Sequence, residues 1–435
     1  MLAYFEYSQL TIEDKKKLVL RNSDSDHKIQ KQVEEIIAEV RENGDRALIS
    51  YAEKFDKVSL KSLIIDEDEI NQQAETVDRN QKRALEIAFN NIYMFHRYQL
   101  TKEKQVETTN GVSCWRENRP IERVGLYIPG GTAVLPSTFL MLAVPARIAG
   151  CKEIVVCSPP QPDGKINPYI AYCAQLLKID TIYSAGGAQA IAAMAYGTES
   201  IPKVDKIFGP GNQYVTQAKT LVQLNANTAI DIPAGPSEVI VIGDDTSNPA
   251  FVAADLLAQA EHGKDSQAVL LSTSKTLIEQ VQQELREQIE VLPRAEIAKK
   301  AIENSYSILF DSKQDLMIFC NDYAPEHLIV SVDEPEAYSR MIMNAGSVFY
   351  GHLTPESAGD YASGTNHTLP TSAHAKAYSG VSVDSFIKKI TFQQINEDGI
   401  LNLGPTIEIL AEIEGLQAHK NAVSIRLKHL QSKNK

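Results

Sequence analysis

The sequence of 435 residues lacks the features that mark several large classes of protein. Its most apolar window, residues 139–146, contains Pro145 and is far shorter than the ~20 residues that a membrane-spanning helix needs. The N-terminus has an early Glu6 and no basic residue before an apolar core, unlike a secretory signal. We therefore expect a soluble, cytoplasmic protein with no membrane partner.

Cysteine and clustered basic residues are also scarce. The five cysteines show no CxxC spacing, which is typical of reduced thiols in a cytosolic protein. Cys114 and Cys151 raise the alternative of a thiolate that adds to an aldehyde, but neither has a histidine nearby in the sequence, so small buried side chains are the better interpretation. The formal net charge of −13 argues against nucleic acid as a partner.

What the sequence does contain, from Arg123 onward, is an alternation of short apolar runs and helix-like segments. Such an alternation predicts βαβ units and parallel-rich sheets. The residues before about 105 have mostly helical periodicity, and His96 lies there in a charged context that suggests the surface. We predict an α/β protein with two incomplete Rossmann-like domains and small helical segments at both ends.

Four glycine turns follow apolar runs: YIPGG (127–131), SAGGAQA (184–190), GPGNQ (209–213) and AGPSE (234–238). None matches GxGxxG, so the standard dinucleotide fingerprint is absent. Because ligands gather at the carboxyl ends of parallel strands, these turns are nevertheless candidate binding sites.

The segment from residue 230 to residue 262 carries the clearest chemical signal. Asn248 and Pro249 suit the N-cap and the first position of a helix. Gln259 and His262 lie three residues apart near its end and would project from one face. An amide oxygen beside an imidazole can hold a cation such as Zn²⁺, whereas a lone histidine there would more often reflect only the helix dipole.

Glu326 and His327 form a second candidate site, in the sequence APEHLIV. Pro325 puts the pair in a loop just before an apolar strand, where both side chains could share a site although adjacent strand residues face opposite ways. A carboxylate and an imidazole are the usual general bases of enzymes. A surface pair at the entrance of a strand explains the motif about equally well.

Two further pairs of residues are weaker candidates. Asp360 and His367 lie in the polar, glycine-rich segment 356–371, which is expected to form a long loop of the kind that often carries function. Asp360 could bind a metal, and His367 could orient a substrate or make turn hydrogen bonds. Glu414 and His419 are five residues apart, and that spacing alone favours two solvated side chains on a helix.

Taken together, these motifs resemble those of the histidinol dehydrogenase family over nearly the whole chain. The most specific part is IDIPAGPSEVIVI followed by AADLLAQAEH, supported by YIPGG, FGPGNQYV, APEHL, SAGDYASGTNHTLPT and EGLQAH. Gly243 is a small departure, since the family usually carries Ala or Cys there. The resemblance implies an NAD-dependent, Zn²⁺-assisted, four-electron oxidation of L-histidinol to L-histidine through histidinal, the last step of histidine biosynthesis.

The resemblance also implies roles for individual residues. Glu326 and His327 would be catalytic. One Zn²⁺ per subunit would be bound by Gln259, His262, Asp360 and His419. The substrate would be contacted by Ser237, Gln259, His262, His327, Asp360, Glu414 and His419, and we add His367 as a substrate contact from its place in the polar segment. NAD would be bound by Tyr127, Gln189 and Asn212, in three of the glycine turns.

Members of the family are homodimers in which the C-terminal segment reaches the neighbour's site. This agrees with the amphipathic stretch from Glu414 to Leu430, which is too small to bury a core of its own. We expect an intertwined homodimer with the following boundaries. These are a small N-terminal segment (1–25), a first α/β domain for substrate and metal (26–126 and 236–381), an inserted second α/β domain with the NAD-binding turns (127–235) and a C-terminal dimerisation segment (382–435).

Two other classes of function remain as alternatives. A zinc-dependent hydrolase could use the same histidine and carboxylate residues to activate water. A non-enzymatic scaffold could be built on the amphipathic C-terminal helix. The formation of NADH with an amino alcohol separates the first alternative from a dehydrogenase, and a metal analysis tests the second.

Overall fold

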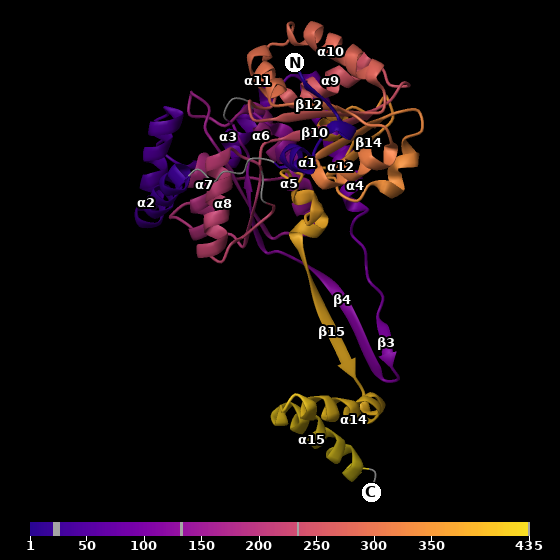
Figure 1. Cartoon of the computed structure of the whole chain (residues 1–435). Helices are drawn as coiled ribbons and strands as arrows, with labels where there is room; N and C mark the ends of the chain where they lie inside the picture. The colour runs from indigo at the N-terminus through magenta and orange to yellow at the C-terminus, as the bar shows by residue number, and fades with distance from the viewer. Residues whose placement is uncertain (21–26, 131–133, 233–234, 434–435) are drawn as a thin grey trace. The chain divides into compact units, whose positions relative to one another are not determined.

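A computed structural model describes residues 1–20, 27–130, 134–232 and 235–433 of the chain. The chain divides into two units (Figure 1). One contains Met1–Gln99 and Ile121–Phe386, and the other contains Leu100–Pro120 and Ile387–Lys435. The described residues form helices and parallel-rich sheets, which confirms the predicted α/β class. Among them, no helix combines the length and the apolar character needed to cross a membrane.

The first of two sheets in the larger unit, called sheet I here, has only parallel pairings among its described strands. Its central strands are buried on both faces, which explains why runs such as VIVI are continuously apolar rather than alternating. In spatial order the strands are β1 (Ala3–Glu6), β12 (Tyr306–Leu309), β11 (Gln267–Ser272), β10 (Glu238–Gly243), β13 (His327–Ser331) and β14 (Ser347–Tyr350).

Helices cover both faces of sheet I. Val239 and Val241 of β10 belong to the core under α9 (Pro249–Ala260), α10 (Lys275–Ile289) and α11 (Ala295–Glu303). Ile240 and Ile242 belong to the opposite core, under α12 (Lys313–Tyr323) and the edge of α1 (Ile12–Val19). Because successive strand residues point to opposite faces, one apolar run supplies both cores.

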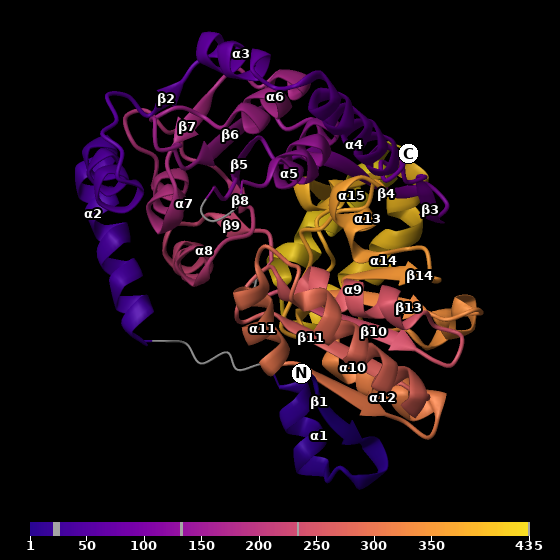
Figure 2. The same cartoon turned by 90° about the horizontal axis from the view of Figure 1, so that it is seen from above.

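The other sheet of the larger unit, sheet II, is parallel except for the pairing of its edge strand β2 with β7. Figure 2 shows α2 alongside α7 and α8, on one side of this sheet. The strands in spatial order are β2 (Ile64–Ile65), β7 (Ile182–Ser184), β6 (Glu153–Ser158), β5 (Arg123–Tyr127), β8 (Lys206–Phe208) and β9 (Ala229–Ile230). The helices on one core are α2 (His27–Tyr51), α7 (Gly187–Tyr196) and α8 (Gln213–Asn225). Those on the other are α3 (Glu67–Glu75), α4 (Arg79–Arg97), α5 (Pro136–Ala149) and α6 (Pro168–Leu177).

The sheets divide the larger unit differently from the expected domain boundaries. Residues 27–97 pack mainly on sheet II, although α4 also bonds Ala362 and Asn366, and β1 from the expected N-terminal segment joins the edge of sheet I. Helical periodicity shows that one face of a helix is buried, but it does not show which sheet covers that face. The helices are therefore present as expected, and what differs from the expectation is the sheet on which they pack.

The smaller unit combines an antiparallel sheet with a helical hairpin. The sheet has the order β15 (Ile387–Ile395), β4 (Val112–Pro120) and β3 (Val106–Thr109). Helices α14 (Glu397–Ile413) and α15 (Gln417–Lys433) meet at Gly415, whose φ of 69° lies in the left-handed region that favours glycine. Of the predicted apolar stripe on α15, Val423, Leu427 and Leu430 are buried within this unit.

A buried ion pair organises the glycine turn after β8. Lys219 of α8 contacts Asp231, and the two side chains are only 4% and 1% exposed. Lys219 Nζ also donates to the Gly209 carbonyl at 3.0 Å, while the Gly209 N–H donates to Asp231 Oδ2 at 2.8 Å. Gly209 is thereby held on both sides, and a Cβ there would lie 2.2 Å from the carbonyl oxygen of Tyr127. Only glycine fits this turn without a shift of the backbone.

We expect Lys219→Met to destabilise the protein by about 3–5 kcal/mol, because it leaves the Asp231 carboxylate buried without its cation. Urea unfolding followed by circular dichroism measures the change. Lys17→Met is the matched control, since Lys17 pairs with Glu13 on an exposed helix surface and should leave the unfolding midpoint nearly unchanged. Equal midpoints for the two variants would contradict this role of the pair.

Candidate active site

The candidate catalytic pair lies at the amino end of β13, between β10 and the edge strand β14 of sheet I. Glu326 and His327 are 6% and 4% exposed. Glu326 Oε2 accepts the backbone N–H of Glu238 at 3.0 Å, which ties the pair to the neighbouring strand β10. A surface pair at a strand entrance is therefore excluded, because both side chains are buried in the fold.

Three carboxyl groups surround the imidazole of His327. Its Nδ1 lies 3.8 Å from Glu326 Oε2 and 4.0 Å from Glu356 Oε1, and its Nε2 lies 3.3 Å from Asp360 Oδ1. Burial alone would lower the pKa of His327, but Glu356, Glu326 and Asp360 together raise this pKa to about 10. Burial raises the pKa of Glu356 to about 8, against the opposing effect of His327. Perturbed groups clustered in this way are typical of catalytic sites.

A set of metal-ligand atoms lies beside this pair. One ligand atom each from His262, Glu356 and Asp360 lies within 4.8 Å of the others. Gln259 is fully buried in the last turn of α9, and His262 follows just after that helix ends at Ala260. The structure thus brings together three of the four residues implied as zinc ligands.

The start of α9 agrees with the prediction from the sequence. The side chain of Asn248 accepts the N–H of Ala250 at 3.0 Å, and Pro249 occupies the first helical position. This cap sets where the helix begins. Gln259 consequently lies at the opposite end, near the amino edge of sheet I, where β10 and β13 start.

Glu356 was not among the residues implied by the sequence. It lies on α13 (Glu356–Tyr361), one turn before Asp360, and it is 1% exposed. The segment was expected to be a loop, because its glycines and serines are poor helix formers. The spacing of four between two carboxylates could have indicated a short helix with both groups on one face.

His367 makes two hydrogen bonds with the protein. Its Nδ1 donates to the backbone carbonyl of Asp360 at 2.8 Å, and its Nε2 lies 3.0 Å from the hydroxyl of Thr138. Burial lowers the pKa of His367. A neutral ring with Nδ1 protonated satisfies both contacts, since Nε2 then accepts from the hydroxyl. In this structure His367 holds the backbone of a candidate ligand, and its role as a substrate contact stays a prediction.

His96 is fully buried, so the expectation that it lies at the surface was wrong. Its Nδ1 bonds the Ile92 carbonyl at 2.9 Å, and its Nε2 lies 3.3 Å from Asn366 Nδ2, which also donates to the Met141 carbonyl at 2.6 Å. The charged neighbours of His96 point elsewhere on α4, and periodicity alone did not reveal this. The contacts anchor the segment that carries His367.

Ser237 and Glu238 stand where β10 begins. Ser237 is half-buried, and its carbonyl accepts the N–H of Gln267 at 3.1 Å. Glu238 is fully buried, and its Oε1 accepts the N–H of Ser372 at 3.0 Å. Ser237 therefore lies at the same edge of sheet I as the catalytic pair. Residues 233–234 of the AGPSE turn fall outside the described residues.

The residues implied for NAD lie at the carboxyl edge of sheet II. Tyr127 ends β5, and its hydroxyl accepts the N–H of Gly187 at 3.0 Å; burial raises the pKa of Tyr127 to about 12. Gln189 is buried in the first turn of α7, after β7. Asn212 caps α8, after β8, by accepting two backbone N–H groups. Residue 131 of the YIPGG turn is outside the described residues.

Glu414 and His419 belong to the smaller unit. Glu414 ends α14 and His419 lies in the first turn of α15; both are exposed. Gly415 breaks the helix between them, so they do not share one continuous helix. They belong to a different unit of the chain from the other candidate residues.

Two other features do not form the site. Burial raises the pKa of Cys151 to about 11, which keeps this thiol protonated and removes the basis for a nucleophilic thiolate.

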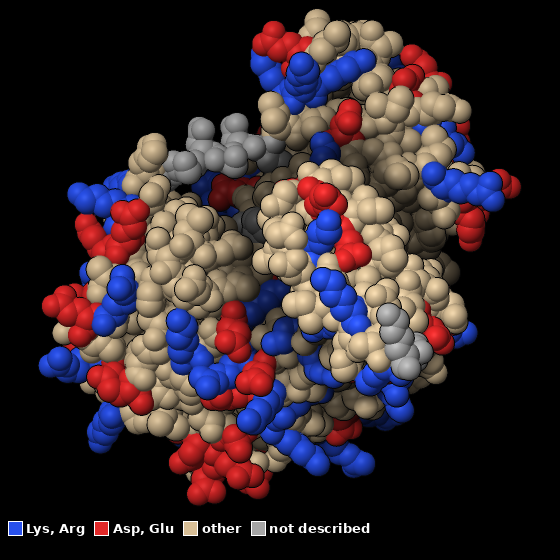
Figure 3. Space-filling model, turned by 90° about the horizontal axis from the view of Figure 1, so that it is seen from below, with Lys and Arg blue, Asp and Glu red and all other residues tan. Residues whose placement is uncertain are grey.

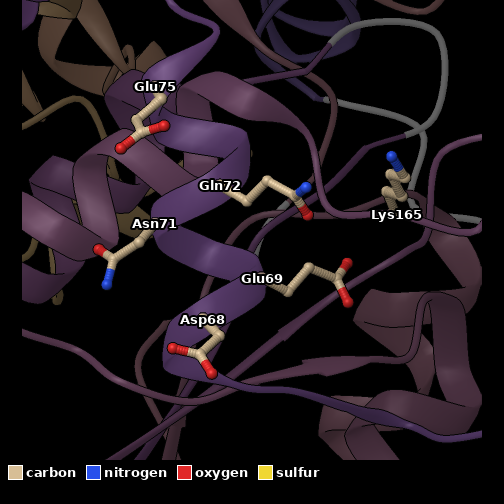
Figure 4. A pocket seen from close by; sticks show the side chains of 6 residues that line it. All are labelled: Asp68, Glu69, Asn71, Gln72, Glu75 and Lys165. Carbon is tan, nitrogen blue, oxygen red and sulfur yellow. The ribbon is translucent and has the colours of Figure 1, made fainter.

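A surface pocket of about 500 Å³ on α3 contains none of the candidate residues (Figure 4). It is lined by Asp68, Glu69, Asn71, Gln72, Glu75 and Lys165. On the face shown in Figure 3, basic and acidic side chains are interspersed.

Comparison with known proteins identifies the family. A sequence-family model described as histidinol dehydrogenase matches residues 19–427. Histidinol dehydrogenase of Bacteroides thetaiotaomicron is 57% identical over 398 residues, covering 92% of this chain and 93% of its own. The chloroplastic histidinol dehydrogenase of Arabidopsis thaliana is 53% identical over 403 residues, covering 92% and 86%.

A solved structure supports the same conclusion. The crystal structure of histidinol dehydrogenase from Elizabethkingia anophelis has a TM-score of 0.95 and 51% sequence identity, and the match covers 99% of each chain. The family assignment and the fold thus agree with the resemblance seen in the sequence motifs. The chain belongs to the histidinol dehydrogenase family and is an oxidoreductase.

Proposed function

We propose that this protein oxidises L-histidinol to L-histidine through histidinal, with reduction of two NAD⁺, as the cytoplasmic last step of histidine biosynthesis. The observation that carries the proposal is the buried pair Glu326 and His327 beside the donor set of Gln259, His262 and Asp360, in a member of this family. The zinc-dependent hydrolase is not favoured, because the relatives are dehydrogenases.

The donor set fits a borderline divalent cation. Asp360 Oδ1 and His327 Nε2 are buried and lie 3.3 Å from each other, and neither atom has a further hydrogen-bond partner among the described residues, which suits a site that holds a ligand. Amide oxygen, imidazole nitrogen and carboxylate oxygen together suit Zn²⁺. We propose that Gln259, His262 and Asp360 hold it, with His419 from a second copy of the chain. When bound, the ion would orient the imidazole and amine of the substrate.

The protein's own residues supply the proton transfers. In the first step His327 would take the hydroxyl proton while a hydride leaves carbon for NAD⁺. The aldehyde must then add water, because only a gem-diol can release a second hydride and end as a carboxylate. Glu326 would take a proton from that water while His327 returns its proton to the aldehyde oxygen, and the neutral His327 would then accept the next proton as the second NAD⁺ is reduced. Burial of the pair excludes bulk water from these transfers.

The residues implied for NAD indicate where the nucleotide would bind. Tyr127, Gln189 and Asn212 come from three different strand-to-helix turns at one edge of sheet II, where dinucleotides bind in open α/β sheets. Helix N-termini there can receive the pyrophosphate. We propose that NAD binds at this edge.

The test of the proposed function is a turnover assay on L-histidinol that counts NADH formed per histidine. We expect a ratio of two, because four electrons leave the substrate as two hydrides. Removal of the metal with a chelator should abolish turnover, and Zn²⁺ should restore it. A ratio near one, or hydrolysis without any nucleotide, would show that the proposed reaction is wrong.

Glu326→Gln separates the two half-reactions. We expect the oxidation of histidinal to fall by about 10²–10⁴-fold, because a neutral amide cannot take a proton from water. The oxidation of histidinol to histidinal should be affected much less, since His327 remains. Separate single-turnover assays from the alcohol and from the aldehyde measure the two steps, and an equal loss in both would refute the division of roles between Glu326 and His327.

A homodimer would explain the apolar surface of the smaller unit. Ile409, Leu410 and Ile413 on α14 are more than half exposed, and Ile425 on α15 is 66% exposed. Contiguous exposed apolar side chains of this kind mark interaction surfaces. We propose that a second copy covers them, and that Glu414 and His419 reach the site of that copy.

Mixed dimers test the shared site. We expect His262→Asn and His419→Asn each to be inactive alone. When the two variants are unfolded and refolded together, half of the dimers are mixed, and each mixed dimer keeps one intact site if His419 acts across the interface. About one quarter of the wild-type sites should then be active. Continued inactivity of properly refolded mixed dimers would place both histidines in one subunit's site.

A further inference from the structure

We propose that Glu356 is a positioning residue of this site, which turns the side-chain amide of Gln259 so that its oxygen, not its nitrogen, faces the cation. The inference rests on the proposed function, because it takes Gln259 as a metal ligand. It adds to that function a residue that the sequence motifs did not single out.

The side chains of Gln259 and Glu356 lie against each other. With its nitrogen directed at Glu356, the amide of Gln259 donates to Oε1 at 2.9 Å and to Oε2 at 3.3 Å. In the opposite orientation the amide oxygen would face two carboxylate oxygens, and acceptors would meet acceptors. When the carboxyl group of Glu356 is ionised, as a cation bound beside it would favour, it accepts hydrogen bonds but has none to donate, so it selects one of the two amide orientations.

The selected orientation leaves the amide oxygen of Gln259 available to the metal. An amide has its donor and acceptor on opposite branches of one planar group, so a nitrogen held by Glu356 directs the oxygen away from it. Only the oxygen is a ligand for a hard or borderline cation. An amide free to turn over would present N–H groups to the ion for part of the time. An ionised Glu356 removes that alternative.

Glu356 is itself held firmly by the fold. Its side chain is 1% exposed on α13, and Asp360 lies one turn further along the same short helix. A Cβ on Gly359 would lie 2.7 Å from the ring of Phe349, so the helix packs closely on sheet I. Glu356 and the ligand Asp360 therefore move as one body. Buried groups that orient metal ligands commonly contribute 10–100-fold to metal affinity.

A direct bond from Glu356 to the ion is the competing possibility, because its oxygen lies within the same 4.8 Å group as atoms of His262 and Asp360. We favour the positioning role because the Gln259 nitrogen, once turned towards Glu356, reaches both of its carboxylate oxygens. A positioning role makes the importance of Glu356 depend on residue 259 being an amide. A direct bond would not have that dependence.

This difference can be measured by a double-mutant cycle on Zn²⁺ affinity, with competition against a chromophoric chelator as the readout. Glu356→Leu should weaken Zn²⁺ binding by about 10–100-fold in the wild-type background. In the Gln259→Glu background it should cost little, because a carboxylate presents an oxygen to the ion in either orientation. Glu356→Gln should weaken Zn²⁺ binding less than Glu356→Leu, since its amide oxygen can still accept from Gln259 although its own N–H groups also permit the other orientation.

The controls keep the result interpretable. Glu303→Leu removes an exposed carboxylate at the end of α11 and should leave Zn²⁺ affinity unchanged. Urea unfolding of the metal-free variants checks that each is folded, and Glu356→Gln supplies a nearly isosteric variant should Glu356→Leu not fold.

Two results would overturn the inference. One is an equal loss of Zn²⁺ affinity from Glu356→Leu in both backgrounds, or from Glu356→Gln as much as from Glu356→Leu, which would indicate a direct ligand. The other is unchanged affinity in the wild-type background. A wild-type protein that binds no Zn²⁺ would overturn the proposed function together with this inference, and so it is distinguishable from a failure of the inference alone.

Discussion

Buried negative charge around a single imidazole is the constraint on which the candidate site depends. Glu326, Glu356 and Asp360 lie within 4.0 Å of His327, and all four side chains are largely shielded from water. Carboxylates placed so close together are costly unless a positive charge lies between them. The protonated His327 supplies that charge in the metal-free protein. A bound cation would take over part of this compensation and leave His327 able to accept protons.

The fold places this cluster at an edge where parallel sheets seldom bind ligands. The general rule puts ligands beyond the carboxyl ends of the strands, and the candidate NAD residues obey it in sheet II. In sheet I, however, Glu326, His327 and Ser237 stand at the amino ends of β10 and β13, and α9 returns there with Gln259. The hydrogen bond between Thr138 of α5 and His367 joins the two regions within the larger unit.

The predictions from the sequence succeeded where a residue's role is local and failed where it depends on partners. The α/β alternation and the cap at Asn248 were predicted because strand runs and helix caps are set within a few residues. The partner of the N-terminal helices was not, since periodicity shows burial and not what causes it. Glu356 and His96 were missed or misplaced for a similar reason: their importance lies in contacts with residues far along the chain.

The alternating faces of β10 separate two kinds of core position along one strand. Val241 packs towards α9, whose last turn carries Gln259, whereas Ile242 packs towards α12, which carries no candidate site residue. A cavity opened at position 241 would therefore loosen the support of a candidate metal ligand, while one opened at 242 would only lower the stability of the fold. Two neighbouring residues that are equally buried thus differ in what their substitution would affect. The sheet separates the core beside the candidate site from the core on its other face, so a substitution in one core need not disturb the other.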